Sequence, residues 1–334
     1  VVLSGVIDNR DKFLNANRIV IVACGTSWHA ALIGEHLIED LCRIPVEVEY
    51  ASEFRYRNPV IHPGDIVIAI SQSGETADTV AALREAKARG CKVMAITNVV
   101  GSAIARESDY VVYIWAGPEI SVASTKAYTT MLIAEYLLGV YLAQQKGVGD
   151  AARLADILEG LQELPEATAK MLQENYLQQI QQAAEGYKAV KDIFFIGRGL
   201  DWAIALEGSL KLKEISYIHS EAYSAGELKH GTISLIEDGT LVIGTLTQDA
   251  LYEKTVSNMV ECKSRGAYLM GLTTYGNYET EDTCDFTVYI PKTDAHFTAS
   301  LAVIPLQLLG YYVSVAKGLD VDKPRNLAKS VTVE

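Results

Sequence analysis

Residues 65–76 read DIVIAISQSGET, an apolar run followed by a loop of small hydroxyl residues. A helical pattern from about Thr79 to Arg89 follows the loop. The first N–H groups of a helix have no internal partner and the helix dipole favours negative charge there, so this strand–loop–helix unit can hold an anion. Serine and threonine hydroxyls add donors, and Gly74 lets the backbone close on a ligand. Taken alone, the loop fits an anion site and a capped turn that binds nothing equally well.

The kind of anion is narrowed by two motifs that the loop lacks. It has no Gly-Lys-Ser/Thr ending, which excludes a nucleotide-binding P-loop. It also lacks the G-x-G-x-x-G fingerprint of a dinucleotide site. A small monophosphate is therefore the ligand that we predict.

Composition limits the partners. The 334 residues carry a formal net charge of −13, which argues against nucleic acid and anionic membranes as partners. A hydrophobic content of 49% and a mean hydropathy of +0.12 describe a compact globular chain of about two domains. The mostly apolar run 299–316 contains Pro305 and Gly310 and is marginal for a membrane span, so we expect a buried helix there.

The five cysteines indicate a reducing, cytoplasmic compartment. They are odd in number, scattered and without metal-type spacing: Cys24, Cys42, Cys91, Cys262 and Cys284. We expect no signal peptide at the start of the sequence. The first residue is Val1, so we expect a fragment whose N-terminal part is absent.

The chain repeats itself. Residues 19–28 match residues 193–202 at an offset of 174 positions, and residues 137–139 match residues 308–310. A period of this length indicates a domain duplication rather than a solenoid.

Each half reads as alternating strands and helices. The expected strands lie near residues 18–23, 46–50, 65–70, 92–97 and 110–115, and again near 192–196, 218–223, 240–246, 267–273 and 286–290. Strands that are apolar on both faces and separated by helices predict the α/β class, with a five-stranded parallel sheet covered on both sides as in Rossmann- or flavodoxin-like three-layer sandwiches. We place the two domains at 1–147 and 191–334, joined by a helical linker at 148–190 in which Pro165 ends the first helix.

Three hydroxyl-rich loops are predicted to meet at one edge of the first sheet, because ligands bind beyond the carboxyl ends of parallel strands. They are Cys24-Gly25-Thr26-Ser27, Ser71 to Thr76, and Val122-Ala123-Ser124-Thr125-Lys126. This convergence favours a phosphate site over a capped turn. The second half has Thr247-Gln248-Asp249-Ala250 opposite the second loop, where an aspartate and a lost glycine spoil an anion site. Only the first half is therefore predicted to bind phosphate.

The second half and the tail offer candidate catalytic groups. Glu207, Lys211 and Glu214 share one helical face, either as a solvated stripe or as a carboxylate base tuned by lysine and burial. His230 lies between glycines, as a structural or an accessible catalytic ring. Lys329 is either an exposed tail lysine or an amine that forms an imine in a pocket.

Together these residues resemble the isomerase part of the glucosamine-6-phosphate synthase family (glutamine–fructose-6-phosphate aminotransferase, isomerizing), a tandem pair of sugar-isomerase (SIS) domains. The resemblance covers essentially the whole chain. It rests on the three loops, on residues 227–231 (Glu-Leu-Lys-His-Gly) and on the tail 324–334. Single SIS loops occur in many sugar-phosphate proteins, whereas the last two segments are more particular to the synthase family.

The resemblance implies a role for individual residues. Glu214 is the expected base that moves a proton between C1 and C2, with Lys211 as its supporting neighbour. His230 is expected to assist ring opening from the neighbouring subunit of a homodimer, and Lys329 to form an imine with the ketose carbonyl. The implied phosphate cradle is Ser71, Gln72, Ser73 and Thr76, and the other implied substrate contacts are Cys24, Gly25, Thr26, Ser27, Val122, Ser124 and Ala328.

The resemblance also implies a reaction. Fructose 6-phosphate opens, condenses with an amine and is aminated at C2 to glucosamine 6-phosphate, a step of hexosamine and UDP-N-acetylglucosamine biosynthesis that needs no metal or cofactor. The family's N-terminal glutaminase domain, which supplies ammonia, is expected to be absent, so the chain alone should interconvert fructose 6-phosphate and glucose 6-phosphate. Two rivals stay open: a stand-alone SIS isomerase or deaminase, and a non-catalytic sugar-phosphate sensor.

Overall fold

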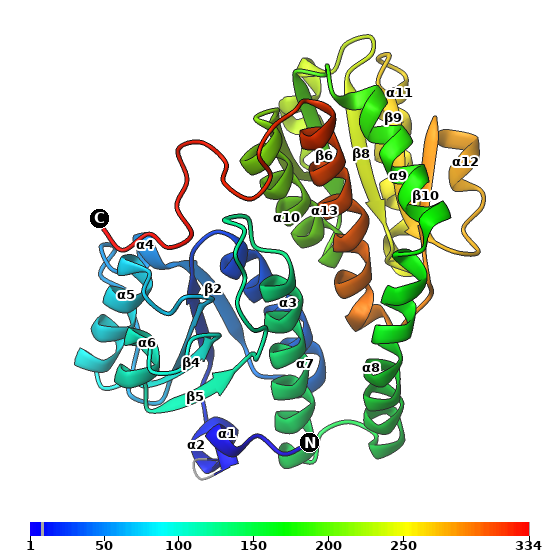
Figure 1. Ribbon diagram of the computed structural model, residues 1–334. Helices are drawn as coiled ribbons and strands as arrows, with labels where there is room; N and C mark the ends of the chain where they lie inside the picture. Colours follow the sequence, from blue (N-terminus) through cyan, green and yellow to red (C-terminus); the bar gives the residue numbers. More distant parts are fainter. Residues whose placement is uncertain (8–9, 334) are drawn as a thin grey trace. The chain divides into compact units, whose positions relative to one another are not determined.

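The protein forms two compact units, each an α/β sandwich (Figure 1). The computed structural model describes residues 1–7 and 10–333. Unit 1 comprises the described residues of 1–156 with the tail from Ala328 to Val333, and unit 2 comprises Ile157–Leu327. The end of the tail, which we grouped with the second domain, thus lies with unit 1. The predicted domain limits themselves stay a prediction.

Unit 1 is built on a five-stranded parallel sheet in the order β2-β1-β3-β4-β5. Its strands are β1 (Ile19–Ala23), β2 (Val46–Tyr50), β3 (Ile66–Ser71), β4 (Lys92–Thr97) and β5 (Tyr110–Tyr113). Its helices are α1 (Ser4–Ile7), α2 (Arg10–Leu14), α3 (Thr26–Cys42), α4 (Ala51–Phe54), α5 (Ala77–Ala88), α6 (Ala103–Glu107) and α7 (Lys126–Lys146). Helix α8 (Ala151–Met171) begins in unit 1 and continues into unit 2 at Ile157. Helices α3 and α7 pack together on one face of the sheet, and α4, α5 and α6 cover the other.

The central strands are buried on both faces, as the apolar runs predicted. All five residues of β1 are buried. Val20 and Val22 share one core with residues of α4, α5 and α6, while Ile19 and Ile21 point the other way because successive strand residues alternate. A strand that is apolar on both faces is stable only between two helical layers, which gives the three-layer sandwich.

Unit 2 repeats this design with a sheet in the order β10-β9-β8-β6-β7. Its strands are β6 (Asp192–Gly197), β7 (His219–Ser224), β8 (Leu241–Leu246), β9 (Tyr268–Thr274) and β10 (Phe286–Ile290). Its helical elements are α9 (Glu174–Tyr187), α10 (Leu200–Ser216), η1 (Leu228–His230), η2 (Thr232–Leu235), η3 (Asp249–Leu251), α11 (Tyr252–Lys263), α12 (Thr280–Thr283), η4 (Ala295–Phe297) and α13 (Thr298–Ala316). All strands pair in parallel. The predicted fold, two duplicated five-stranded parallel sheets with covering helices, is confirmed.

The prediction that Pro165 ends a helix is wrong, because α8 continues through it to Met171. Ile157, Leu164 and Met171 are all buried and lie seven residues apart, so one apolar stripe runs past the proline. Pro165 itself is exposed, which leaves the carbonyl group that loses its partner on the solvent side of the helix. Packing of this stripe outweighs the local cost of the proline.

The apolar run near the C-terminus forms α13, which packs against α10 and α9 within unit 2. By length and composition alone, residues 295–316 would be long and apolar enough to span a membrane, and 61% of an 18-residue apolar window within them is buried in the fold. The expected buried helix is therefore present.

A buried carboxylic acid is one difference between the two helix pairs α3/α7 and α10/α13. In unit 1 the carboxyl of Glu135 on α7 lies against Gly34 of α3, where an added Cβ would come within 2.7 Å of Oε1. In unit 2 the repeat places Leu306 against Gly208 in the same way. Glu135 is 1% exposed, and neither of its carboxyl oxygens has a hydrogen-bond partner among the described residues. Burial raises the pKa of Glu135 well above its ordinary value.

We expect Glu135→Leu, which copies the repeat, to stabilise unit 1 by about 2 kcal/mol, because it removes an unpaired buried polar group. The gain should grow with pH. A raised pKa in the folded state means that this group's favourable contribution is complete below about 4.5 and is lost as the pH rises towards the folded pKa. Urea unfolding at pH 6 and pH 9, followed through Trp28, measures the gain. The reciprocal Leu306→Glu should destabilise unit 2, and an unfolding free energy of Glu135→Leu below that of the wild type at pH 9 would contradict the argument.

Candidate functional site

The phosphate loop, Ser71–Thr76, leaves the sheet at its topological switch point. Ala23 pairs with Ile70 in register, so the loops after β1 and β3 emerge side by side. After β1 the chain continues to β2 at one edge of the sheet, and after β3 it continues to β4 in the direction of the other edge. Ligands of open α/β sheets bind in the crevice that this reversal creates.

Hydrogen bonds within the phosphate loop gather its hydroxyls at the start of α5. Gly74 N donates to Ser71 Oγ at 3.1 Å, and Ser71 Oγ lies 3.2 Å from Thr76 Oγ1. Glu75 N donates to Ser73 Oγ at 3.2 Å. The three hydroxyls therefore lie where the dipole of α5 favours a negative charge.

Gly74 is required by this geometry. Its φ is +68°, a left-handed conformation that favours glycine, and an added Cβ would lie 2.1 Å from Ser102 Oγ. The glycine thus lets the loop close against the neighbouring loop that holds Ser102.

The loop after β1 supplies the predicted Cys24-Gly25-Thr26-Ser27 segment. Gly25 has a φ of +56° and immediately precedes α3, which begins at Thr26. The Cys24 thiol accepts a hydrogen bond from Thr79 Oγ1 at 3.9 Å. Burial raises the pKa of Cys24, so the thiol is protonated at neutral pH and is not a nucleophile there.

The C-terminal tail folds onto the phosphate loop. Ala77 N, at the start of α5, donates to the carbonyl of Val331 at 3.1 Å. Ser330 Oγ lies 3.1 Å from Ser73 Oγ. Lys329 Nζ is 3.5 Å from Ser124 Oγ and 2.9 Å from Glu119 Oε2. The structure thus brings together four of the predicted elements, namely the phosphate loop, the loop that holds Ser124, Lys329 and the tail, while Glu334 lies outside the described residues.

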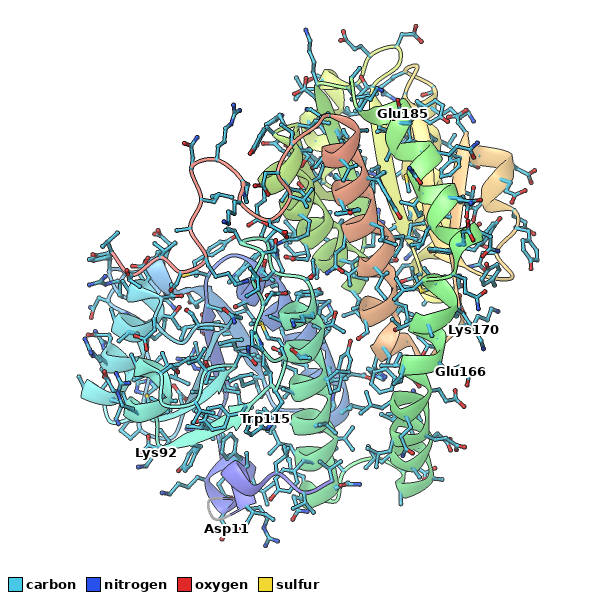
Figure 2. All side chains as sticks on the ribbon, in the orientation of Figure 1. Asp11, Lys92, Trp115, Glu166, Lys170 and Glu185 are labelled. Atoms are coloured by element: carbon cyan, nitrogen blue, oxygen red, sulfur yellow. The ribbon has the colours of Figure 1, made fainter. Side chains whose placement is uncertain are left out.

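An open pocket of about 610 Å³ lies beside this meeting point. Its walls include Gln72, Ser73, Asn98, Trp115, Glu119 and Lys329. Trp115, which follows β5, is 76% exposed and is labelled in Figure 2. The pocket therefore offers hydroxyl and amide donors, one ammonium group and an aromatic wall. Among the other predicted contacts, Val122 is half-buried and Ala328 is exposed.

In unit 2 the loop that corresponds to the phosphate loop binds the carboxylate of Asp201. Thr247 N and Gln248 N donate to Asp201 Oδ2 at 2.9 and 3.2 Å, and Thr247 Oγ1 donates to Asp201 Oδ1 at 2.5 Å. Burial raises the pKa of Asp201 to about 6 despite these bonds. We predicted that Asp249 spoils this loop, but the residue that fills it is Asp201, the repeat partner of Ser27.

Lys211 on α10 links two acidic residues. Its Nζ lies 3.3 Å from Glu207 Oε1 and 2.6 Å from Glu214 Oε2. The side chains of Lys211, Glu207 and Glu214 are 2%, 0% and 20% exposed, so this is not a solvated stripe. Burial alone would lower the pKa of Lys211, but the two carboxylates outweigh it and hold that pKa above its ordinary value.

The fold itself does not require these charges. The repeat places Ile33 and Leu37 of α3 opposite Glu207 and Lys211, and both are buried. An apolar pair thus occupies the same position in unit 1. A buried charged group that the fold can do without is a candidate functional group.

His230 ends the short helix η1 in unit 2 and is exposed. Residue 230 is therefore accessible to solvent. Its proposed role at a partner subunit stays a prediction.

Comparison with known proteins identifies the class to which this fold belongs. The SIS domain model matches residues 12–141 and 187–317, and the chain belongs to the SIS domain family. Its sequence corresponds to the isomerase region of glutamine–fructose-6-phosphate aminotransferase. It is 55% identical over 334 residues to that protein of Caldanaerobacter subterraneus subsp. tengcongensis, and the match covers 100% of this chain and 55% of the relative. The chain spans about half the length of the curated relatives that it matches.

Solved structures agree. The C-terminal domain of glucosamine-fructose-6-phosphate aminotransferase from Francisella tularensis superposes with a TM-score of 0.91 at 37% identity, covering 97% of this chain and 92% of that one. Glucosamine-6-phosphate deaminase from Thermotoga maritima superposes with a TM-score of 0.77 at 24% identity, covering 97% and 96% of the two chains, and shares the fold. The predicted family resemblance is confirmed.

Sequence reasoning missed Glu119 and Asp201. Glu119 lies 210 positions before Lys329, and no spacing rule connects a loop residue with a tail that folds back. Asp201 could have been noticed, because it replaces Ser27 in the repeat at a helix start where a carboxylate has nearby backbone donors.

Proposed function

We propose that this chain is the sugar-phosphate isomerase region of an enzyme that forms glucosamine 6-phosphate. In this proposal it binds fructose 6-phosphate, converts the ketose to the aldose, and aminates C2 when ammonia is supplied. The observation that carries the proposal is the tail folded against the phosphate loop, which places an amine beside a cluster of hydroxyl donors.

The phosphate group of the sugar would anchor the substrate in the site. The hydroxyls of Ser71, Ser73 and Thr76 and the start of α5 would hold it against the negative charge of the chain. A fixed phosphate leaves the other end of the sugar free to reach reactive groups in one orientation, which lowers the entropic part of the barrier.

Lys329 is the proposed carbonyl-reactive amine. After ring opening, its nitrogen would add to C2 of the ketose, and loss of one water would give an imine. Ammonia would then add to this imine and release the free lysine, so that the ammonia nitrogen stays bound to C2. Ser124 Oγ, which lies 3.5 Å from the amine, is the proposed hydrogen-bonding partner of the sugar or of the lysine.

Glu214 is the proposed base that takes a proton from C1 and returns it to C2. Lys211 Nζ, 2.6 Å from Glu214 Oε2, would hold this carboxylate in place. His230 is proposed to assist ring opening from the neighbouring subunit of a homodimer. A glutaminase domain in the longer protein would supply ammonia, and we place the protein in the cytoplasm because all five cysteines are free.

The test is conversion of fructose 6-phosphate to glucose 6-phosphate by this chain without glutamine or ammonia. We expect turnover with fructose 6-phosphate and none with fructose, because only the phosphorylated sugar engages the loop. Binding without turnover would favour a sugar-phosphate sensor. Turnover that survives removal of residues 324–334 would favour a stand-alone SIS isomerase, and absence of binding would refute the sugar-phosphate assignment.

A further inference from the structure

Glu119 has an unusual position for a loop residue. It lies between β5 and α7, yet its side chain is only 4% exposed. One carboxylate oxygen, Oε1, accepts hydrogen bonds from Thr125 N at 2.8 Å and from Ala127 N at 3.4 Å, with Thr125 Oγ1 at 3.4 Å. The other oxygen, Oε2, meets Lys329 Nζ at 2.9 Å. Each oxygen therefore serves a different segment of the chain.

The first oxygen fixes the carboxylate. Helix α7 begins at Lys126, and Thr125 at its N-cap makes no capping bond with its own side chain. Glu119 caps the helix instead, because its Oε1 accepts a hydrogen bond from Ala127 N. This N–H group is one of those at a helix start that have no partner within the helix. Burial alone would raise the pKa of Glu119, but the Thr125 N–H and the Lys329 ammonium outweigh it and hold that pKa below its ordinary value. The group is therefore a charged acceptor whose position is set by α7.

The second oxygen is then available for the tail. Ala328 and Val331, the apolar residues of the tail nearest to Lys329, are exposed, so apolar packing contributes little to its position. Lys329 itself is 26% exposed, and its ammonium contacts Glu119 and Ser124. A partly buried ion pair with a fixed carboxylate restricts the long lysine side chain more than a fully exposed pair does.

We propose that Glu119 is a positioning residue that holds the amine of Lys329 at the wall of the pocket beside the phosphate loop. Its consequence for turnover rests on the proposed function, whereas its hold on the tail does not. Glu119 acts through Lys329 rather than on the substrate, so its loss should lower kcat more than it raises KM.

The test variant is Glu119→Gln, because a glutamine oxygen can still accept from the start of α7 while the charge that attracts Lys329 is removed. Glu107→Gln is the matched control, since Glu107 pairs with Arg84 on an exposed part of the same unit. The melting temperature of each variant is measured first, and equal values show that α7 is intact.

Two readouts separate the outcomes. Limited trypsin digestion of the full chain, with mass spectrometry of the released 330–334 peptide, measures access to the bond after Lys329. We expect Glu119→Gln to be cut about tenfold faster than wild type and Glu107→Gln at the wild-type rate. If detaching the tail costs about 1.4 kcal/mol less in Glu119→Gln, the detached state that trypsin cuts is about ten times more populated. In the isomerase assay, and in trapping of the Lys329 imine with borohydride, we expect a loss of about 10²-fold in kcat and in trapping rate, with little change in KM.

If Glu119→Gln is cleaved at the wild-type rate and keeps the wild-type kcat, the inference about Glu119 is overturned. In that case, turnover by the wild type would still support the proposed function. If the wild type fails to turn over fructose 6-phosphate, the proposed function falls, and the cleavage rates still decide whether Glu119 holds the tail.

Discussion

Glu214→Gln should lower the turnover of fructose 6-phosphate to glucose 6-phosphate by about 10³-fold. A positioned general base contributes roughly 10²–10⁴-fold to such a reaction, and glutamine has nearly the same shape but cannot accept the proton. Its amide oxygen can still accept from Lys211, which lies 2.6 Å from Glu214 in the wild type. Calorimetric titration should therefore give a dissociation constant for fructose 6-phosphate within about twofold of wild type, with the loss confined to kcat.

Glu185→Gln is the matched control for this prediction. Glu185 lies on α9 of the same unit, is 61% exposed, and pairs with Lys188 at the surface (Figure 2). Its turnover should equal that of the wild type. A Glu214→Gln enzyme that keeps at least a fifth of wild-type kcat would remove Glu214 from the role of base.

The fold was predictable from the sequence because the relevant signals are local. The central strands β1, β3, β4, β8 and β9 are mostly apolar runs of five to seven residues, and such a run between helices has few other stable environments. The repeat then supplied a second, independent copy of the same pattern. Pro165 was misjudged because the stripe of Ile157, Leu164 and Met171, which keeps α8 intact, depends on what the helix packs against.

The site was predictable only in part. The phosphate loop can be recognised from the sequence, because a strand, hydroxyl residues, a glycine and a helix start occur within twelve residues. The partner of Lys329 does not, because the ion pair with Glu119 joins residues 210 positions apart. Likewise, the helical spacing of Glu207, Lys211 and Glu214 is the same for a solvated stripe and for a buried cluster, and only burial distinguishes them.

The second large effect concerns that buried cluster. Lys211→Met should lower the free energy of unfolding of unit 2 by about 3–5 kcal/mol at pH 8, because it leaves the carboxylates of Glu207 and Glu214 without their cation. Methionine fills a similar volume, so the loss reports the charge rather than a cavity. Urea unfolding followed by fluorescence, in a background where Trp202 of α10 is the only tryptophan, measures unit 2. The control Lys188→Met removes an exposed surface cation, and we expect a change below about 0.5 kcal/mol.

Unit 1 supplies the decisive companion variant. Its helix α3 carries Ile33 and Leu37 where α10 carries Glu207 and Lys211, and both side chains are buried in a stable core. Glu207→Ile combined with Lys211→Leu should therefore recover most of the stability that Lys211→Met loses, since a well-packed apolar pair replaces a buried ion pair at little cost. It should not recover turnover, because Glu214 would still lack its lysine. Recovery of both stability and kcat would mean that the cluster serves only the fold, whereas recovery of stability alone would mean that unit 2 keeps a buried lysine for its chemistry.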